Sequence, residues 1–376
     1  MRRLTPSPVD RGGVSADRQA ASDPFELSAE AEQRAARLHR ETGIVDGLVA
    51  GTYYLDDPEY RDRLPAAGIV AGNLTVGGPA FDFEATVASV TDIRERVHTN
   101  DDNYCLVESV ADIDTAADTD RTGIVLGFQG GNWVGDDLSR VRTVAALGVR
   151  VIDLTYNRGN SLGDGCCEPR DAGLTMLGRE AVAELNDLGV VIDVAHANDQ
   201  TTHDVVAHST DPVIASHVGC RALANAQGRA KTDEQLAAVA ANGGVNCITP
   251  FPPVIARDPE THEVQQATVH DVLDHVDHAV DVGGVDSVAF GGDMSDRTLD
   301  QESISEGSNL GVWRQSHPEV YGAGPTDRMD PYPEGLSRYT ELQNLTRGLV
   351  AREYTDEEIR KILGGNLRRL FDTVWE

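Results

Sequence analysis

The chain has 376 residues, a length that fits either two or three ordinary domains or one large barrel with insertions. It carries 32 basic and 62 acidic residues, a net charge of −30, so its surface repels nucleic acid and anionic membranes. Lysine occurs only at positions 231 and 361, and dispersed acidic charge with scarce lysine is typical of proteins kept soluble in concentrated salt. We therefore expect a cytoplasmic protein of a halophilic cell.

The first segment, residues 1–24, contains no run of apolar residues. We expect a disordered tail there, and neither an export signal nor a membrane anchor. No later apolar run has the length needed to cross a bilayer. The five cysteines form neither a paired framework nor a CxxC zinc pattern, so we expect reduced thiols. They stand at 105, 166, 167, 220 and 247.

Eight short apolar runs, rich in Val and Ile and bounded by turn residues, predict buried parallel strands. In chain order they lie at 43–49, 69–76, 122–128, 149–156, 190–195, 212–216, 245–251 and 286–293. Predicted helices separate nearly all of these strands, which favours a single closed (β/α)₈ TIM barrel over residues 25–376. A Gly/Pro-rich loop is expected at 297–333. Two helices should then extend the barrel at its C-terminus, the second opened by a capping box of Thr355 and Glu358.

Two of the predicted strands stop at a histidine: His196 follows VVIDVA and His217 follows PVIAS. The carboxyl ends of parallel strands meet at one edge of a barrel, where barrel enzymes place their chemistry, so we expect both imidazoles at a functional site. The alternative is that each histidine only caps its strand by hydrogen bonding. Three more histidines give a weaker signal, since interleaved aspartates favour a solvated helix face over a metal site. They are His270, His275 and His278.

Five longer blocks carry a more specific signal. They are ALGVRVIDLTYN, GLTMLGREAVAELNDLGVVIDVAH, PVIASHVGCRAL, VAFGGD and YTDEEIRKILGGNLRRLF. In this order they resemble one enzyme family, the renal or membrane dipeptidases, and the resemblance runs from about residue 43 to the C-terminus. It implies a barrel enzyme with two zinc ions at the carboxyl ends of the strands.

The resemblance also implies a ligand set, which this chain keeps only in part. In the family, a His-x-Asp pair after the first strand holds one zinc, two histidines after the fifth and sixth strands hold the other, and a glutamate after the third bridges them. Here the His-x-Asp positions fall on Leu48 and Ala50 in DGLVA, and the bridging position falls on Gln129 in GFQGG. Leucine and alanine cannot ligate a metal, and a neutral amide is a poor bridge between two cations. We therefore expect no two-zinc centre.

Other family positions survive or are replaced by a different polar group. The family histidine that stabilises the tetrahedral intermediate falls on Tyr156. The family arginine that grips the substrate carboxylate falls on Arg229, with Arg221 as the alternative. The positions that keep the family residue are His196, His217, Arg229 and Asp293.

These residues predict a metal-dependent hydrolase that acts on a dipeptide-like or other small amide substrate with at most one zinc ion. The expected metal ligands are His196 and His217, with Gln129 or Asp293 as a third, and the same set also suits Fe(II). The expected catalytic groups are Asp293 and Tyr156. Arg229 and Asn157 are expected to bind the small carboxylated or peptide-like substrate. The resemblance also implies a homodimer.

Two other functions stay open at this point. One is a metal-free isomerase or lyase on the same barrel, with His196 or His217 as general base and Tyr156 or Asp293 as acid. The other is a catalytically inactive homologue that still binds a small peptide-like ligand through Arg229. The metal content of the purified protein separates these functions from a metal-dependent one.

Overall fold

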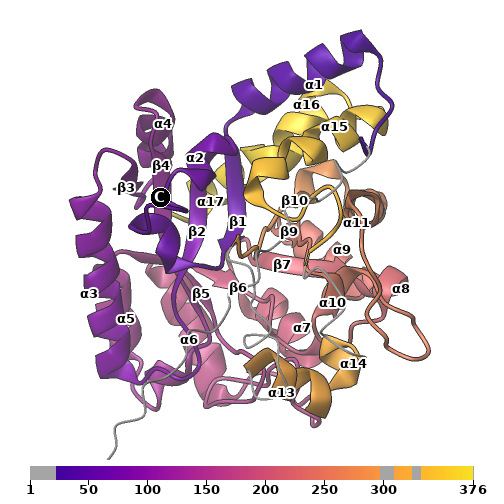
Figure 1. The fold of residues 1–376 in the computed structure, drawn as a ribbon. Coiled ribbons are helices and arrows are strands. Elements are labelled where there is room, and N and C mark those ends of the chain that lie inside the picture. The colour runs from indigo at the N-terminus through magenta and orange to yellow at the C-terminus, as the bar shows by residue number, and fades with distance from the viewer. Residues whose placement is uncertain (1–22, 297–308, 324–331, 376) are drawn as a thin grey trace, which may run out of the picture.

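The computed structural model describes residues 23–296, 309–323 and 332–375. Its centre is a barrel of parallel strands with helices on the outside, the architecture that the sequence predicts (Figure 1). The barrel strands are hydrogen-bonded in the order β1-β2-β4-β5-β6-β7-β9-β10. Their bounds are β1 Ile44–Val49, β2 Ile69–Gly77, β4 Thr122–Gln129, β5 Val149–Asp153, β6 Val191–Asp193, β7 Ile214–Cys220, β9 Val245–Ile248 and β10 Val288–Phe290.

Hydrogen bonds after the last barrel strand join it to the first. The amide of Asp293 donates to the carbonyl oxygen of Leu48 in β1 at 2.8 Å. The amide of Gly292 donates to Oδ1 of Asp46 at 2.7 Å, and the hydroxyl of Tyr339 donates to Oδ2 of the same carboxylate at 2.7 Å. The buried Asp46 therefore helps to close the barrel, and the carbonyl oxygen of Leu48 holds Asp293 beside β1.

Helices surround the barrel, and several of them begin at the Ser, Thr, Asp or Asn residues that the capping rules favour. The predicted capping box is confirmed: the Thr355 amide donates to Glu358 Oε2 at 2.8 Å, and the Glu358 amide donates to Thr355 Oγ1 at 3.3 Å. The helices are α1 Ala29–Thr42, α2 Arg63–Ala66, α3 Phe83–Thr99, α4 Val110–Asp118, α5 Ser139–Ala146, α6 Met176–Asp187, α7 Asp199–His208, α8 Arg221–Ala224, α9 Asp233–Ala241, α10 Pro252–Ile255, α11 Val269–Gly283, α13 Asn309–Ser316, α14 Pro318–Tyr321, α15 Gln343–Ala351, α16 Asp356–Arg360 and α17 Asn366–Val374. No helix within the described ranges combines the length and the apolar character that a bilayer crossing demands.

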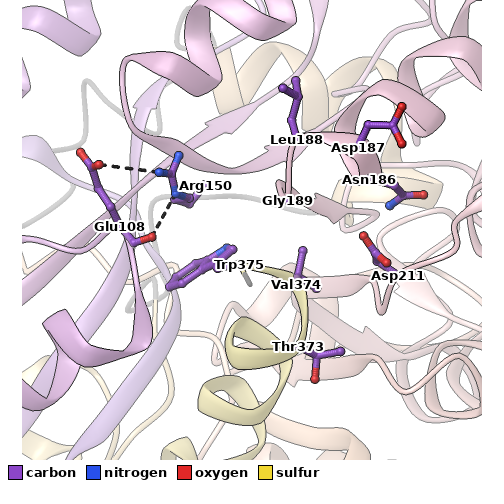
Figure 2. Close-up of a pocket in the computed structure, with 10 residues that line it drawn as sticks. All are labelled: Glu108, Arg150, Asn186, Asp187, Leu188, Gly189, Asp211, Thr373, Val374 and Trp375. Atoms are coloured by element: carbon purple, nitrogen blue, oxygen red, sulfur yellow. Dashed lines mark hydrogen bonds and ion pairs between the residues drawn. The ribbon is translucent and has the colours of Figure 1, made fainter.

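The C-terminal helix α17 plugs the barrel at the amino ends of the strands. Small apolar side chains from successive strands, among them Val45, Val125 and Val191, pack there against Leu370 and Phe371 of α17. Next to this plug lies a polar pocket of about 360 Å³, shown in Figure 2, with Trp375 on one side and the carboxylates of Asp187 and Asp211 on the other. This end of the barrel is therefore filled, and the opposite end carries the predicted site residues.

Several strand boundaries differ from the sequence prediction, and the structure adds two short strands. The sixth predicted strand was expected to stop at His217, but β7 continues through this residue to Cys220. The continuation pairs with a two-residue strand, β8 Ala230–Lys231, and a second short strand, β3 Tyr104–Leu106, pairs with β4. Both short strands escape a search for apolar runs, because only pairing with a longer neighbour defines them.

The predicted loop at 297–333 is wrong over residues 309–323, which form α13 and α14. Residues 297–308 and 324–331 of that segment lie outside the described ranges. Most of the predicted tail, residues 1–22, also lies outside them. Asp23, at its end, is described and places Oδ1 2.7 Å from Nη2 of Arg347.

His275 is buried, contrary to the expected solvated helix face, with only 1% of its surface exposed. Its Nδ1 accepts from the amide of Cys220 at 2.8 Å, so its Nε2 donates to the carbonyl oxygen of Ile255 at 3.0 Å. Burial lowers the pKa of His275 to about 4. The residue falls on the apolar face of α11, between Val272 and Val276.

Candidate active site at the carboxyl ends of the strands

His196 and His217 come together at the carboxyl ends of β6 and β7, as the sequence predicts. Their Nε2 atoms face one another at 3.0 Å, and 2% of His196 and none of His217 is exposed. Burial, and then the positive charge of Arg229, hold the pKa of both imidazoles well below the usual value. Both rings are therefore neutral near pH 7, the form in which imidazole ligates a metal or accepts a proton.

A buried carboxylate fixes the tautomer of His217 through a hydroxyl. Ser216 Oγ donates to Asp193 Oδ2, and His217 Nδ1 lies 2.7 Å from the same Oγ. Because that hydroxyl proton is used by Asp193, His217 Nδ1 carries a hydrogen and donates it to Ser216. The lone pair of His217 therefore sits on Nε2, and Nε2–H of His196 donates to it. This is the outer-shell arrangement that orients metal-binding histidines.

Tyr156 lies beside this pair, and the charge of Asp293 acts on Tyr156 and Arg229. The Tyr156 ring stacks on His196, with ring centroids 4.0 Å apart and 27° between the planes. Asp293 has φ 45°, a left-handed conformation rare for a residue with a side chain, and such strain is concentrated at functional sites. Burial raises the pKa of Asp293 to about 6, against the lowering effect of Arg229.

Arg229, rather than Arg221, is the arginine of the site. It is 1% exposed; its Nη1 donates to the carbonyl oxygen of Ala195 at 2.8 Å and its Nη2 to that of His217 at 3.3 Å, while its buried Nε has no hydrogen-bond partner among the residues that the structure describes. A buried guanidinium held only by carbonyl oxygens keeps a net charge for an anion. Arg221 instead forms a two-point pair with Asp199 at 2.5 and 2.6 Å.

Asn157 and Gln129 are engaged elsewhere. The hydroxyl of Tyr321 donates to Asn157 Oδ1, and Cys166 Sγ lies 3.4 Å from the same oxygen. Gln129 ends β4 and donates from Nε2 to Thr75 Oγ1 at 2.7 Å. The structure gives neither side chain a hydrogen bond to the histidine pair, and their assigned roles stay predictions.

Sequence reasoning missed several polar groups around the pair. Asp193 and Ser216 lie inside strands that read as apolar runs, so only the hydrogen bonds described above single them out. Cys166 Sγ lies 3.9 Å from His196 Nδ1. Burial opposes ionisation of this thiol, but a hydrogen bond with Cys167 and the charges of Arg229 and Lys231 hold its pKa below the usual value. The adjacent cysteines in the loop after β5 were the available signal.

The family model for membrane dipeptidase (peptidase family M19) matches residues 20–309, well over half of the chain. The chain belongs to the membrane dipeptidase family. By family, it is a metallodipeptidase-like hydrolase, and the resemblance drawn from its sequence is confirmed.

Solved structures agree with this membership. An amidohydrolase from Pseudomonas aeruginosa is 29% identical with a TM-score of 0.78, covering 91% of this chain and 99% of its own. The probable dipeptidase PvdM from the same organism is 22% identical with a TM-score of 0.73, covering 93% and 99%. A metallo peptidase from Rhodobacter sphaeroides, liganded with a phosphinate mimic of the dipeptide L-Ala-D-Ala, is 20% identical with a TM-score of 0.70, covering 89% and 99%. At these lower identities the last two show the same fold.

The two-metal centre that the family implies does not fit this member. Leu48 is 1% exposed and packs as an apolar core residue, and Ala50 is exposed. Among the residues that the structure describes, no group of three or more His, Cys, Asp or Glu side chains is placed to share one ion. The histidine pair supplies two nitrogens from neutral rings, and Leu48, Ala50 and Gln129 add no imidazole, thiolate or carboxylate to them.

Proposed function

We propose that this member of the family hydrolyses the amide bond of a dipeptide-like or other small amide substrate, using at most one metal ion held by His196 and His217. The observation that carries the proposal is the pair of buried, neutral imidazoles whose Nε2 atoms face one another at 3.0 Å. Two nitrogens that converge in this way suit zinc. The Asp193–Ser216 network favours a lone pair on Nε2 of His217, and metal binding would require the hydrogen of His196 to move from Nε2 to Nδ1. A bound metal would polarise the amide carbonyl and lower the pKa of a water molecule.

The chain's own side chains would then position the substrate. Arg229 would hold a substrate carboxylate, because its charge is buried and its Nε has no hydrogen-bond partner in the described part of the chain. The Tyr156 hydroxyl would donate to the oxygen on which negative charge develops, since burial raises the pKa of Tyr156 and keeps its proton in place. Asp293, with a pKa of about 6, would accept a proton near neutral pH and return it to the leaving amine.

The test is metal content together with hydrolysis of a dipeptide panel, after purification in high salt. About one equivalent of zinc, with turnover lost on chelation and regained on zinc addition, supports the proposal. Tyr156→Phe should lower kcat by about 100-fold or more and leave the metal content unchanged, since it removes one donor to the developing oxyanion. Two equivalents of zinc in the wild type would contradict it.

A metal-free acid–base enzyme is the second candidate, and the chain of hydrogen bonds from Asp193 through Ser216 and His217 to His196 favours it. Such a chain can hold or move a proton without a metal, as an isomerase or lyase requires. Turnover that persists in a chelator, in protein free of metal, would support this candidate over the first.

A further inference from the structure

A large cleft lies against Tyr156, the residue that stacks on His196, and most of its wall is apolar. Its volume is about 1050 Å³, and sites for drug-sized ligands span roughly 300–1,000 Å³. Phe81 and Pro79 come from the segment between β2 and α3, and Val312, Trp313 and Tyr321 come from α13 and α14. A ligand as small as a dialanine would leave much of this apolar wall in contact with water.

The wall made by α13 and α14 is fastened to the barrel. Arg257 is 4% exposed, and it donates from Nε to the carbonyl oxygen of Ala224 at 2.8 Å and from Nη1 to that of Val320 in α14 at 3.2 Å. Arg314 in α13 donates from Nη2 to the carbonyl oxygen of Ala323 at 3.0 Å. The two helices adjoin one another at the same end of the barrel in Figure 1. The cleft is therefore preformed, which reduces the entropy lost when it binds a ligand.

Trp313 is the largest side chain of this wall. Its ring lies 5.1 Å from that of His317 and 5.3 Å from the guanidinium carbon of Arg158, and the residue remains partly exposed. Contacts with these two neighbours restrain the indole while part of its surface stays open. Such a rigid aromatic surface is what a flat or branched apolar group packs against most favourably.

The cleft borders the site already described through Tyr156 and Asn157. Tyr156 and Asn157 line it, and Tyr156 also stacks on His196, so one ring joins the cleft to the histidine pair. The match to the family model ends at residue 309, which is the first residue of α13. The helical wall therefore lies outside the matched part of the chain, and its chemistry has to be judged from its own residues.

We propose that the cleft receives a bulky apolar side chain of the substrate, aromatic or branched aliphatic, and that Trp313 determines this preference. The inference rests on the proposed function, because it concerns the substrate class of the same site. An apolar group that fills the cleft displaces water from Phe81, Val312 and Trp313, and a single methyl group cannot. The substrate is then a dipeptide-like amide that carries one large apolar side chain.

The experiment compares Phe- and Leu-containing dipeptides with Ala–Ala for the wild type and for Trp313→Ala. The wild type is expected to prefer the bulky substrates by tenfold or more in kcat/KM, on the order of the discrimination that apolar pockets achieve. Trp313→Ala should remove about tenfold of that preference and leave kcat/KM for Ala–Ala nearly unchanged. Trp313→Phe, which keeps an aromatic surface, should retain most of it. Equal kcat/KM for bulky and small substrates in the wild type would overturn the inference.

The matched control is Trp375→Ala, which removes an indole at the opposite end of the barrel (Figure 2) and should leave the preference intact. Melting curves verify that each variant is folded at the assay temperature.

Ketomethylene analogues, in which a methylene replaces the amide nitrogen, separate this inference from the proposed function because no enzyme can hydrolyse them. Tighter binding of the Phe–Ala analogue than of the Ala–Ala analogue, lost in Trp313→Ala, supports the cleft assignment even if no dipeptide is hydrolysed. Hydrolysis of dipeptides without any such difference in binding would uphold the function and refute the assignment.

Discussion

The two halves of the candidate site differ in how many of the ligand residues implied by the family resemblance they retain. On the β6–β7 side, His196 and His217 remain, and the network of Asp193 and Ser216 that orients His217 stands behind them. On the β1–β4 side, the positions to which the family resemblance assigns metal ligands hold Leu48, Ala50 and Gln129. The remaining carboxylate there, Asp46, is occupied by Tyr339, Gly292 and Leu48.

This difference indicates how a barrel can lack the ligands for a second metal ion and still keep its fold. A second divalent cation needs anionic ligands to offset its lost hydration, and the β1–β4 side offers an apolar side chain and a neutral amide instead. The β6–β7 side needs no anion in direct contact, because neutral imidazoles suffice and their outer-shell partners are intact. The four predictions below test this contrast, starting from the largest expected effect.

Removing either imidazole should abolish the function of the retained half. His196→Ala and His217→Ala are each expected to lower kcat/KM by at least about a thousandfold and to eliminate bound metal, because one remaining nitrogen cannot hold the ion. Metal analysis and dipeptide assays measure both effects. His278→Ala, on the outer helix α11, is the control and should change neither. Full turnover in either site variant would refute the role of the pair.

Restoring the ligands that the family resemblance implies on the β1–β4 side should allow a second metal ion to bind. The triple variant Leu48→His, Ala50→Asp and Gln129→Glu returns the three family ligands to β1 and β4, and we expect the metal content to rise by about one equivalent. Metal analysis of the folded variant after dialysis against zinc measures the change. The variant Gln129→Glu alone, which returns only the bridge, should not bind the additional ion. An unchanged metal content in the folded triple variant would show that more than the ligands separates the two halves.

Loss of the Ser216 hydroxyl should weaken metal binding by the histidine pair without abolishing it. Ser216→Ala removes the link between His217 and Asp193, so His217 loses its fixed tautomer, and a drop of about 10- to 100-fold in metal affinity is expected. Titration with zinc measures the affinity, and Ser216→Thr, which keeps the hydroxyl, should recover part of it. An unaltered affinity in Ser216→Ala would mean that backbone geometry alone orients the ring.

The pH dependence of turnover tests the role of Asp293, which connects the two sides of the site. Its amide is hydrogen-bonded to Leu48 on the β1–β4 side, and the charge of Arg229, which is buried beside His217, acts on its carboxylate. Burial raises its pKa to about 6, and the carboxylate is the form that accepts a proton. Turnover should therefore be full above about pH 7 and should fall up to tenfold per unit below pH 6. A pH–rate profile measures this limb, and Asp293→Asn should lower activity and flatten the remaining profile. A wild-type profile that stays level down to pH 5 would exclude the assigned role.

Local patterns sufficed for much of this molecule. Val- and Ile-rich runs predicted all eight barrel strands, because residues of parallel strands buried on both faces must be apolar whatever their neighbours are. The losses at Leu48, Ala50 and Gln129 were also visible in the sequence, since a side chain without a suitable donor atom cannot ligate a metal in any fold.

Contacts between distant parts of the chain decided the rest. Only packing selected Arg229 over Arg221, because the first is buried beside His217 while the second pairs with Asp199. Only packing buried His275 and built the cleft wall at Trp313 from a segment that reads as loop. The amino-acid order determined the barrel and which metal ligands were lost, through the chemistry of single residues and short runs. The tertiary structure alone decided the charge, tautomer and surroundings of the residues that remain, because these depend on neighbours that the sequence does not place side by side.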